Sequence, residues 1–353
     1  MKIMFDEFLL NLMNAVPDGI PGLVILLAII AAALFVLSKG ADILVDSAVA
    51  LSEKWGVPKM LIGATVVSLG TTLPEVTVSV MSALKGAPGL AMGNAVGSVI
   101  CDTGLILGIA ALIKPLPFKK TVVNRQGWIQ LGAGILLVAV SFIAGGGIRS
   151  FSEGGSIPRV MGFVFLGLLA VYIVSTIAGA RKGTDAESRD TDNPSGENGS
   201  SVAVILLKMI LGAALVILSS KVLIPAVQET ALRFRIPETV IAATLVAFGT
   251  SLPELITAIT AARKGHGDLA IGNIIGADIL NVLFVIGASA AVTPGGLTVD
   301  VNFFRILFPA MLFVLIVFRC GVLFSKNALK RPVGFVLLAA YVAVTALSYV
   351  SGV

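Results

Sequence analysis

Apolar residues collect in ten stretches along the chain, and polar residues collect between them. The apolar stretches begin near residues 21, 58, 88, 127, 158, 202, 237, 268, 303 and 332. Most of them approach the length of about 20 residues that a helix needs to cross the hydrocarbon core of a bilayer. This pattern predicts an all-α polytopic membrane protein with ten transmembrane helices.

The composition agrees with a chain that lies mostly in lipid. Hydrophobic residues make up 57% of the chain and charged residues only 13%, whereas a soluble domain carries about 25% charged residues. The net charge of +5 comes from basic residues between the apolar stretches, the pattern that orients membrane proteins. We therefore expect the lipid bilayer as a partner and no nucleic acid. Cys101 and Cys320 lie in apolar stretches and are expected to be small packing residues.

One polar stretch divides the chain. Residues 181–201 hold five acids and three bases among Gly, Ser and Pro, which is typical of a disordered linker. It separates a first five-span repeat, residues 21–180, from a second, residues 202–353. With the N-terminus outside, the inner loops hold fifteen Lys and Arg residues and the outer segments seven. The excess inside predicts a cytoplasmic linker, with both termini extracytoplasmic, in a plasma or inner membrane.

Two apolar stretches carry the same interruption, GTTLPE at residues 70–75 and GTSLPE at residues 249–254. A proline inside a helix removes one amide donor and pushes away the carbonyl four residues before it. Pro74 and Pro253 should therefore break their helices and free one carbonyl each. Inside a bilayer, broken backbone survives only where it is buried in protein or lines a cavity.

Glu75 and Glu254 follow these two prolines directly. A charged carboxylate at the bilayer centre costs at least about 2.5–3.5 kcal/mol, so an acid at this depth is a candidate for function. The two glutamates, the neighbouring hydroxyls and the freed carbonyls together form an oxygen-rich cage. Hard cations such as Ca2+ are bound by such oxygen ligands.

The two interruptions belong to an internal repeat. Residues 63–108 align with residues 242–287 without a gap and share 18 identities in 46 positions. Each repeat holds five spans, an odd number, so the second copy enters the membrane upside down. The sequence therefore predicts two inverted five-helix repeats whose broken helices meet near the midplane.

The third and eighth apolar stretches each supply a polar stripe on one helical face, with members four residues apart. The stripes are Asn94, Ser98 and Asp102 in the third stretch and Asn273, Ala277 and Asn281 in the eighth. Asp278 lies beside the second stripe but points about 100° away from it. The pattern leaves open whether Asp278 reaches the ion site or makes a polar contact between helices.

Two further charged features have simpler interpretations. Asp42 and Asp46 are one helical turn apart on one face with Lys39, which predicts a paired structural cluster. His266, the only histidine, lies in a short turn between apolar stretches, and we expect a solvated loop residue.

GTTLPE with the following GNAVGS, and GTSLPE with GNIIGA, resemble the two α-repeats of the calcium/cation antiporter superfamily, and its prokaryotic sodium/calcium exchangers above all. The resemblance implies that Glu75 and Glu254 bind Ca2+ together with Thr71 and Thr250. It also implies sodium sites that add the hydroxyls of Thr72 and Ser251, the carbonyls of Ser68 and Ala247, and the side chains of Ser98, Asp102 and Asn281. Ca2+ and Na+ are then cargo, and no resident cofactor is expected.

The chain departs from that family pattern at two positions. Residue 277 is alanine where the better-described sodium-coupled members tend to have serine, so one sodium site lacks a side-chain ligand. The aspartate of the Asp102/Asn281 pair lies in the first repeat, whereas those members usually carry it in the second. Both departures leave K+-dependent exchange and proton/cation antiport open as alternatives to Na+/Ca2+ exchange.

Two other classes fit the sequence less well than an antiporter. A channel usually places rings of ligands at subunit contacts, whereas an inverted repeat provides one internal site. An intramembrane enzyme would need catalytic groups, and the chain has no HExxH motif and no catalytic Ser-His or Cys-His pairing. We therefore expect a non-enzymatic antiporter, functional as a monomer. The resemblance implies that it works by alternating access, with its first and sixth spans moving against a core.

Overall fold

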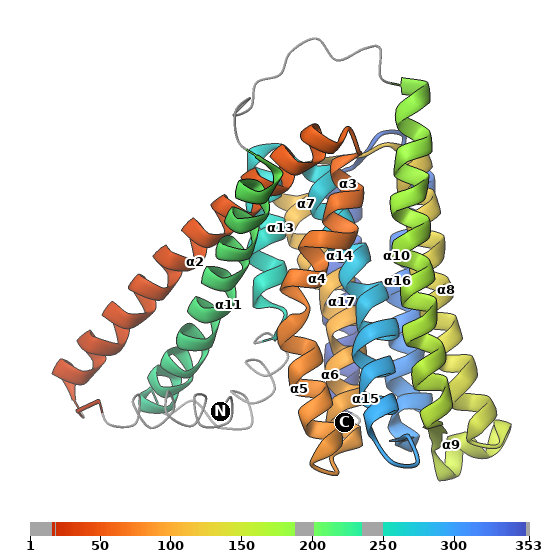
Figure 1. The fold of residues 1–353 in the computed structure, drawn as a ribbon. Helices are drawn as coiled ribbons and strands as arrows, with labels where there is room; N and C mark the ends of the chain where they lie inside the picture. The colour runs from red at the N-terminus through yellow and green to blue at the C-terminus, as the bar shows by residue number, and fades with distance from the viewer. Residues whose placement is uncertain (1–15, 18, 188–200, 235–249, 351–353) are drawn as a thin grey trace.

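The computed structural model describes residues 16–17, 19–187, 201–234 and 250–350 (Figure 1). This part of the chain is nearly all helical. Seven of its helices are long and apolar enough to cross a membrane, or eight if one bent pair counts as a single span. The prediction of an all-helical membrane protein is confirmed in this form. The count of ten is not, partly because residues 235–249 of the predicted seventh span lie outside the described ranges.

The first half of the chain contains one long helix, one bent span and three further spans. In chain order its helical segments are α2 (Ile20–Trp55), α3 (Lys59–Ile62), η1 (Gly63–Val67), α4 (Ser68–Thr71), α5 (Leu73–Leu84), α6 (Pro88–Ile100), η2 (Cys101–Ile106), α7 (Leu107–Ile113), α8 (Lys120–Ala144), η3 (Gly147–Arg149), α9 (Ser150–Glu153) and α10 (Arg159–Glu187).

The second half begins with another long helix, α11. Its described helical segments are α11 (Val202–Arg233), α13 (Leu252–Lys264), α14 (Gly267–Leu280), η4 (Asn281–Ile286), α15 (Gly287–Val292), η5 (Phe303–Leu307), α16 (Phe308–Phe324) and α17 (Arg331–Val350). Helix α11 continues through Pro225 to Arg233.

Helices α2 and α11 lie side by side and lean away from the other helices (Figure 1). They can approach closely because glycines face each other where they cross. A Cβ atom on Gly212 would lie 2.9 Å from the carbonyl oxygen of Gly40. The N-terminal part of α2, including Leu26 and Leu37, packs on α11 in two small hydrophobic clusters separate from the main core.

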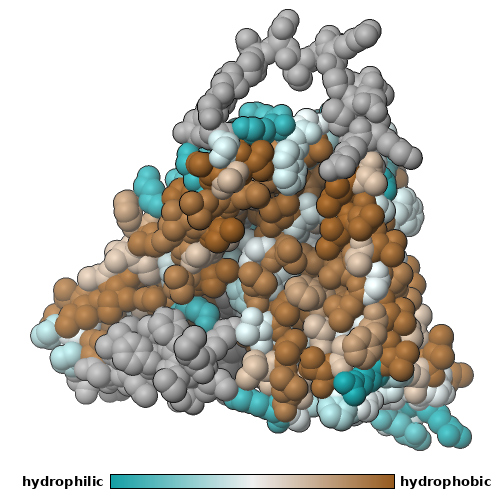
Figure 2. Space-filling model, viewed as in Figure 1, coloured by the Kyte–Doolittle hydropathy of each residue, from teal (hydrophilic) through white to brown (hydrophobic). Residues whose placement is uncertain are grey.

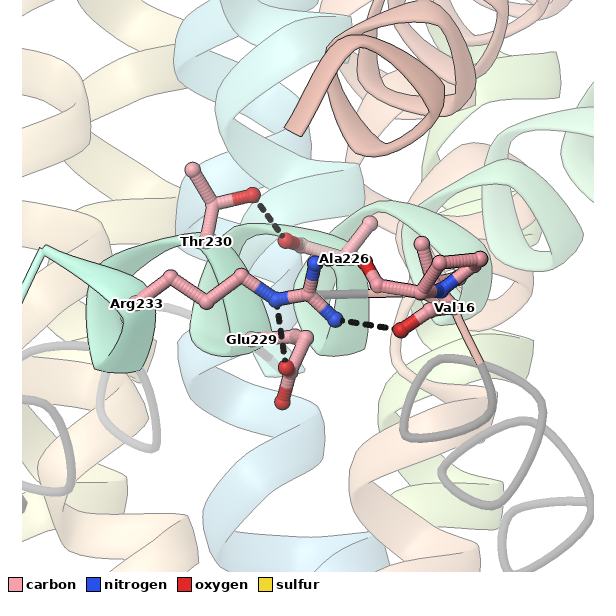
Figure 3. A network of polar contacts seen from close by, with 6 residues as sticks. Val16, Ala226, Glu229, Thr230 and Arg233 are labelled. Carbon is pink, nitrogen blue, oxygen red and sulfur yellow. Dashed lines mark hydrogen bonds and ion pairs between the residues drawn. The ribbon is translucent and has the colours of Figure 1, made fainter. Parts of the chain in front are cut away.

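Arg233 at the C-terminal end of α11 ties the two helices together at one end (Figure 3). Its guanidinium donates hydrogen bonds to the carbonyls of Val16 and Pro17, just before α2, and to the Glu229 carboxylate, at 2.7–2.8 Å. Toward its other end, α2 enters the main core through Leu44 and Leu51. Helices α2 and α11 thus form one unit that is anchored in the core through the C-terminal part of α2 and through Ile205 and Met209 in the N-terminal part of α11.

The main core surrounds α14, which is the most completely enclosed of the long helices. In the span Gly267–Val292, 94% of an apolar stretch of 18 residues is buried, against 22% of the corresponding stretch in α2. Helix α14 contacts α3, η1 and α4 of the bent span, α13, and α8. The sequence pattern reflects this position, because every described residue from Gly267 to Leu280 except Asp268 is apolar, glycine, Asn273 or Asp278.

Two short antiparallel sheets connect loops of the two halves. β1 (Leu116–Pro117) pairs with β4 (Ala328–Leu329), and β2 (Gly155–Ile157) pairs with β3 (Leu297–Val299). β1 follows α7 at the upper end of Figure 1, and β2 follows α9 at the lower end. The loops of the two halves are therefore joined at both ends of the bundle.

The outer surface is what a bilayer requires. Large apolar side chains stay exposed along the helices, for example Phe163, Val171 and Val174 on α10. In Figure 2 hydrophobic residues cover most of the visible height, and the strongly hydrophilic ones gather mainly at the upper and lower ends. Since soluble proteins rarely leave such a continuous apolar surface uncovered, this supports insertion in a membrane.

Four described segments, η1, η2, η4 and η5, have the wider π-helical turn. No pattern in the sequence predicts these turns. Such turns are rare in proteins and occur frequently at functional sites. Two of them, η2 and η4, begin within one residue of aligned positions of the repeat, at Cys101 and Asn281.

Candidate ion-binding site

The first motif breaks its helix as the sequence predicts. Helix α4 ends at Thr71, α5 begins at Leu73, and the two parts of the span differ in direction by 46°. Pro74 lies in the first turn of α5, where its missing N–H group leaves no helical hydrogen bond unmade. In the second motif α13 likewise begins at Leu252, with Pro253 in its first turn.

Glu75 and Glu254 therefore lie in the first turn of a helix, and both are only 1% exposed. The positive end of a helix dipole favours an anion at this position. Thr72 Oγ1 donates a hydrogen bond to Glu254 Oε1 at 3.5 Å, and Thr71 also interacts with the Glu254 side chain. Hydroxyls of the first half thus approach the carboxylate of the second half.

Asn94 on α6 makes the reverse connection. Its Nδ2 donates to Ser79 Oγ at 2.9 Å and to the carbonyl of Glu75 at 3.3 Å, and its Oδ1 accepts from Thr250 Oγ1 at 3.2 Å. The sequence placed Asn94 on the polar stripe without naming it as a ligand. In the structure it orients the Glu75 backbone and joins the two motifs.

Of the other predicted oxygen ligands, Asp102, Ser251, Ser98 and Asn281 are buried. Asp102 is 1% exposed, and the charge of Glu254 acts on it. Ser251 lies beside Asp102, and Ser98 is buried one helical turn before it on α6. Among the described residues, Asp102 Oδ1, Glu254 Oε2 and Asn281 Oδ1 have no hydrogen-bond partner.

Unpaired buried oxygens of this kind are costly in a protein interior, at roughly 1–3 kcal/mol each. A bound cation offsets that cost. Within the described ranges, no three Asp, Glu, His or Cys side chains come together as a metal-holding group. A cation here would therefore be held by carboxylates in combination with hydroxyl, amide and carbonyl oxygens, as the sequence analysis expects.

Of the two predicted carbonyl ligands, Ser68 and Ala247, only Ser68 lies among the described residues. The Ser68 carbonyl already accepts two hydrogen bonds, from the Thr72 amide at 2.9 Å and from Thr71 Oγ1 at 3.3 Å. Thr71 would have to turn its hydroxyl away for this carbonyl to bind an ion. Ala247 lies outside the described residues.

Asp278, which the sequence left open, makes a polar contact between helices. Its Oδ2 accepts a hydrogen bond from Thr103 Oγ1 and another from Gln130 Nε2, both at 2.5 Å. The charges of Asp278 and Glu254 both act on Asp102, so the cluster adjoins the cage. Sequence reasoning missed Gln130, although Gln126 and Gln130 are polar residues one helical turn apart in a stretch that is otherwise mostly apolar.

The charged cluster on α2 is also present, with a different partner from the one expected. Lys264 at the end of α13 binds Asp42 Oδ1 at 3.1 Å and Asp46 Oδ1 at 2.7 Å, while Lys39 lies over the Phe35 ring. This ion pair joins α2 to the core.

His266 is half-buried rather than fully solvated, with Nδ1 3.4 Å from Lys59 Nζ. Burial lowers the pKa of the imidazole, and the Lys59 charge lowers it further. Neutral imidazole is therefore favoured at this loop, which lies away from the carboxylates of the cage.

The chain resembles known proteins over nearly its whole length. A family model described as "Sodium/calcium exchanger protein" matches residues 25–178 and 204–350. The "Inner membrane protein YrbG" of Escherichia coli (strain K12) is 34% identical over 91% of this chain and 96% of its own length. The "Sodium/calcium exchanger MaX1" of Methanosarcina acetivorans is 30% identical over 87% of this chain and 93% of its own.

A solved structure agrees with these relatives. The sodium-calcium exchanger NCX_Mj, soaked with Na+, matches this fold with a TM-score of 0.75 at 26% identity. The match covers 92% of this chain and 99% of that one. The multi-pass helical fold described above is therefore the fold of a known exchanger.

Proposed function

The chain belongs to the sodium/calcium exchanger protein family, and we propose that this antiporter exchanges Ca2+ against Na+ at one shared site between its two halves. The observation that carries the proposal is the crossed contact at the helix breaks. Thr72 of the first half reaches Glu254 of the second, and Thr250 of the second half reaches Asn94 of the first. Neither half forms the site alone.

The ligand set follows from this geometry. Glu75 and Glu254 bind Ca2+ with Thr71 and Thr250, and the two carboxylates neutralise its charge. Na+ uses some of the same oxygens together with Thr72, Ser251, Ser98, Asp102, Asn281 and the carbonyls of Ser68 and Ala247. Because Ca2+ and Na+ compete for one set of oxygens, the binding of one ion displaces the other, and exchange results.

Alternating access is proposed to come from the α2/α11 unit. The N-terminal part of α2 packs mainly on α11, with Leu252 and Ile256 of α13 beside it, whereas its C-terminal part is anchored in the main core. A helix pair held mainly through one end can change its tilt while the cage residues keep their places. We further propose the ten-helix inverted repeat, with halves at 21–180 and 202–353, and a monomer as the working unit. K+-dependent exchange and proton/cation antiport are less favoured, because the matching family model and the relative MaX1 are both described as sodium/calcium exchangers.

The experiment that tests the shared site is charge removal at either glutamate. Glu75→Gln and Glu254→Gln should each lower Na+-driven 45Ca2+ uptake into proteoliposomes by at least about 100-fold, because a buried, unpaired positive charge is left in the cage. Thermal unfolding in detergent checks that each variant is folded. Normal Ca2+ flux in either purified, folded variant would refute the assignment.

We propose that the linker, residues 181–201, is cytoplasmic and that both termini are extracytoplasmic. In Figure 1, α10 ends and α11 begins at the upper end of the molecule, opposite the start of α2, which supports a linker on the other side from the N-terminal end. Ser188→Cys and Ser351→Cys, each in a chain lacking Cys101 and Cys320, should be labelled by an impermeant thiol reagent from opposite sides of the membrane. Labelling of both from the same side would overturn the arrangement.

A further inference from the structure

A second polar cluster lies where α8, α14 and η2 meet, next to the cage. It consists of Asp278, Thr103 and Gln130, which are at most 2% exposed. Thr103 Oγ1 and Gln130 Nε2 both donate to the same carboxylate oxygen of Asp278, and Gln130 Nε2 also lies 3.0 Å from Thr103 Oγ1. The three side chains are thereby fixed against each other.

Each of the two larger side chains has one oxygen that this arrangement does not use. Asp278 Oδ1 and Gln130 Oε1 are buried, and neither has a hydrogen-bond partner among the described residues. In that part of the chain no basic side chain forms an ion pair with Asp278. While Asp278 is ionised both atoms are acceptors, so a hydrogen-bond donor or a cation compensates their burial.

The chemistry of these oxygens selects a monovalent cation. A carboxylate, an amide carbonyl and a hydroxyl are hard oxygen ligands. Ca2+ takes six to eight oxygens, and dedicated divalent sites usually draw on more than one carboxylate. The cluster supplies few oxygens and a single carboxylate, whose one negative charge balances the one positive charge of Na+.

The charge of the whole region points the same way. Glu75, Glu254, Asp102 and Asp278 place four carboxylates in or next to the cage, and the charges of Glu254 and Asp278 act on Asp102. One Ca2+ neutralises two of them. An exchanger that releases Ca2+ for Na+ needs places for several monovalent charges, and Asp278 offers one that Ca2+ does not require.

We propose that Asp278 Oδ1 and Gln130 Oε1, with Thr103, form an additional Na+ site adjoining the shared cage. The inference rests on the proposed function for its role in coupling, although binding at the cluster can be measured without transport. Residue Asp278 is then a specificity-determining ligand: it affects the response to Na+ and leaves Ca2+ binding in place.

The test is the stabilisation of the purified protein by Na+ and, separately, by Ca2+, followed as unfolding temperature in detergent. Asp278→Asn keeps the shape and one oxygen for the two donors but removes the charge. It should raise the Na+ concentration for half-maximal stabilisation about tenfold and leave the Ca2+ curve, taken without Na+, unchanged. Gln130→Met should shift the Na+ curve in the same direction. Gln126→Met, one turn away on α8 and 1% exposed, is the matched control and should shift neither curve.

Each contrary result has a distinct meaning. An unchanged Na+ curve in folded Asp278→Asn, or in Gln130→Met if the first variant does not fold, would show that the cluster is only a contact between helices. Equal losses for Na+ and Ca2+ would place Asp278 in the shared cage and overturn a separate site. If the wild-type chain binds Na+ with the expected dependence on Asp278 but does not exchange ions, the proposed function fails and this site stands.

Discussion

The helices α6 and α14 start from nearly the same motif and are used differently. Both carry a Gly-Asn pair followed by a second glycine, and both continue into a π-helical segment. In α14, a Cβ atom on Gly272 would lie 2.1 Å from the Met60 carbonyl oxygen. In α6, a Cβ atom on Gly93 or Gly97 would meet no atom of the described residues within 4 Å.

The acids of the two helices differ in the same way. The alignment of the repeats puts Asp102 opposite Asn281, and Asp278 opposite Val99. Each acid has one buried oxygen with no hydrogen-bond partner among the described residues, but the charge of Glu254 acts on Asp102, whereas the other oxygen of Asp278 is held by Thr103 and Gln130. Each repeat thus contributes one acid from this helix, but at positions that are not equivalent. The comparison shows that two repeats of similar sequence can contribute matching residues to the proposed cage. Their helices still differ in packing and in the positions of their acids.

The packing difference leads to the largest expected effect. Gly272→Ala should destabilise the folded protein by about 1–3 kcal/mol or more, since a methyl group there overlaps backbone atoms that cannot move aside. Gly93→Ala should be neutral or slightly stabilising, because alanine favours a helix by up to about 1 kcal/mol over glycine. Unfolding temperatures of the two purified variants measure the contrast. Equal damage from both would contradict the difference in packing around the two glycines.

Local chemistry made the centre of the site predictable. The helix breaks before Pro74 and Pro253 follow from the missing amide donor of proline, and the burial of Glu75 and Glu254 follows from their position within apolar stretches. Each inference needs only a residue and its near neighbours in sequence. The crossed contacts between the halves were expected in general terms, because an inverted repeat brings its two broken helices together.

Contacts between distant segments were less predictable. No residue type encodes a π-helical turn, which depends on how neighbouring helices pack, so η2 and η4 left no signal in the sequence. The partners of Asp278 come from two other spans, and Lys264, the partner of Asp42 and Asp46, lies more than 200 residues away from them. Periodicity gives the face on which a side chain lies, but it does not identify the helix that the face meets.

A smaller effect is expected at the aligned pair Asp102/Asn281, in which only the first repeat carries an acid. In the proposed site Glu75 and Glu254 alone neutralise Ca2+, so Asp102→Asn should keep Na+-driven Ca2+ flux within about tenfold of the wild type, a change of roughly 1.4 kcal/mol. The double variant Asp102→Asn/Asn281→Asp restores the number of charges in the cage and moves one of them to the aligned position of the other repeat. Because both residues are 1% exposed and lie at the start of a π-helical segment, it should recover part of the lost flux. The measurement is 45Ca2+ uptake into proteoliposomes with Na+, K+ and pH gradients applied one at a time.

If wild-type flux needs K+ and Asp102→Asn removes that need, Asp102 holds a co-transported K+ and the K+-dependent alternative is correct. If the double variant is less active than the single one, the two positions are not interchangeable, and the asymmetry of the repeats extends into the cage itself.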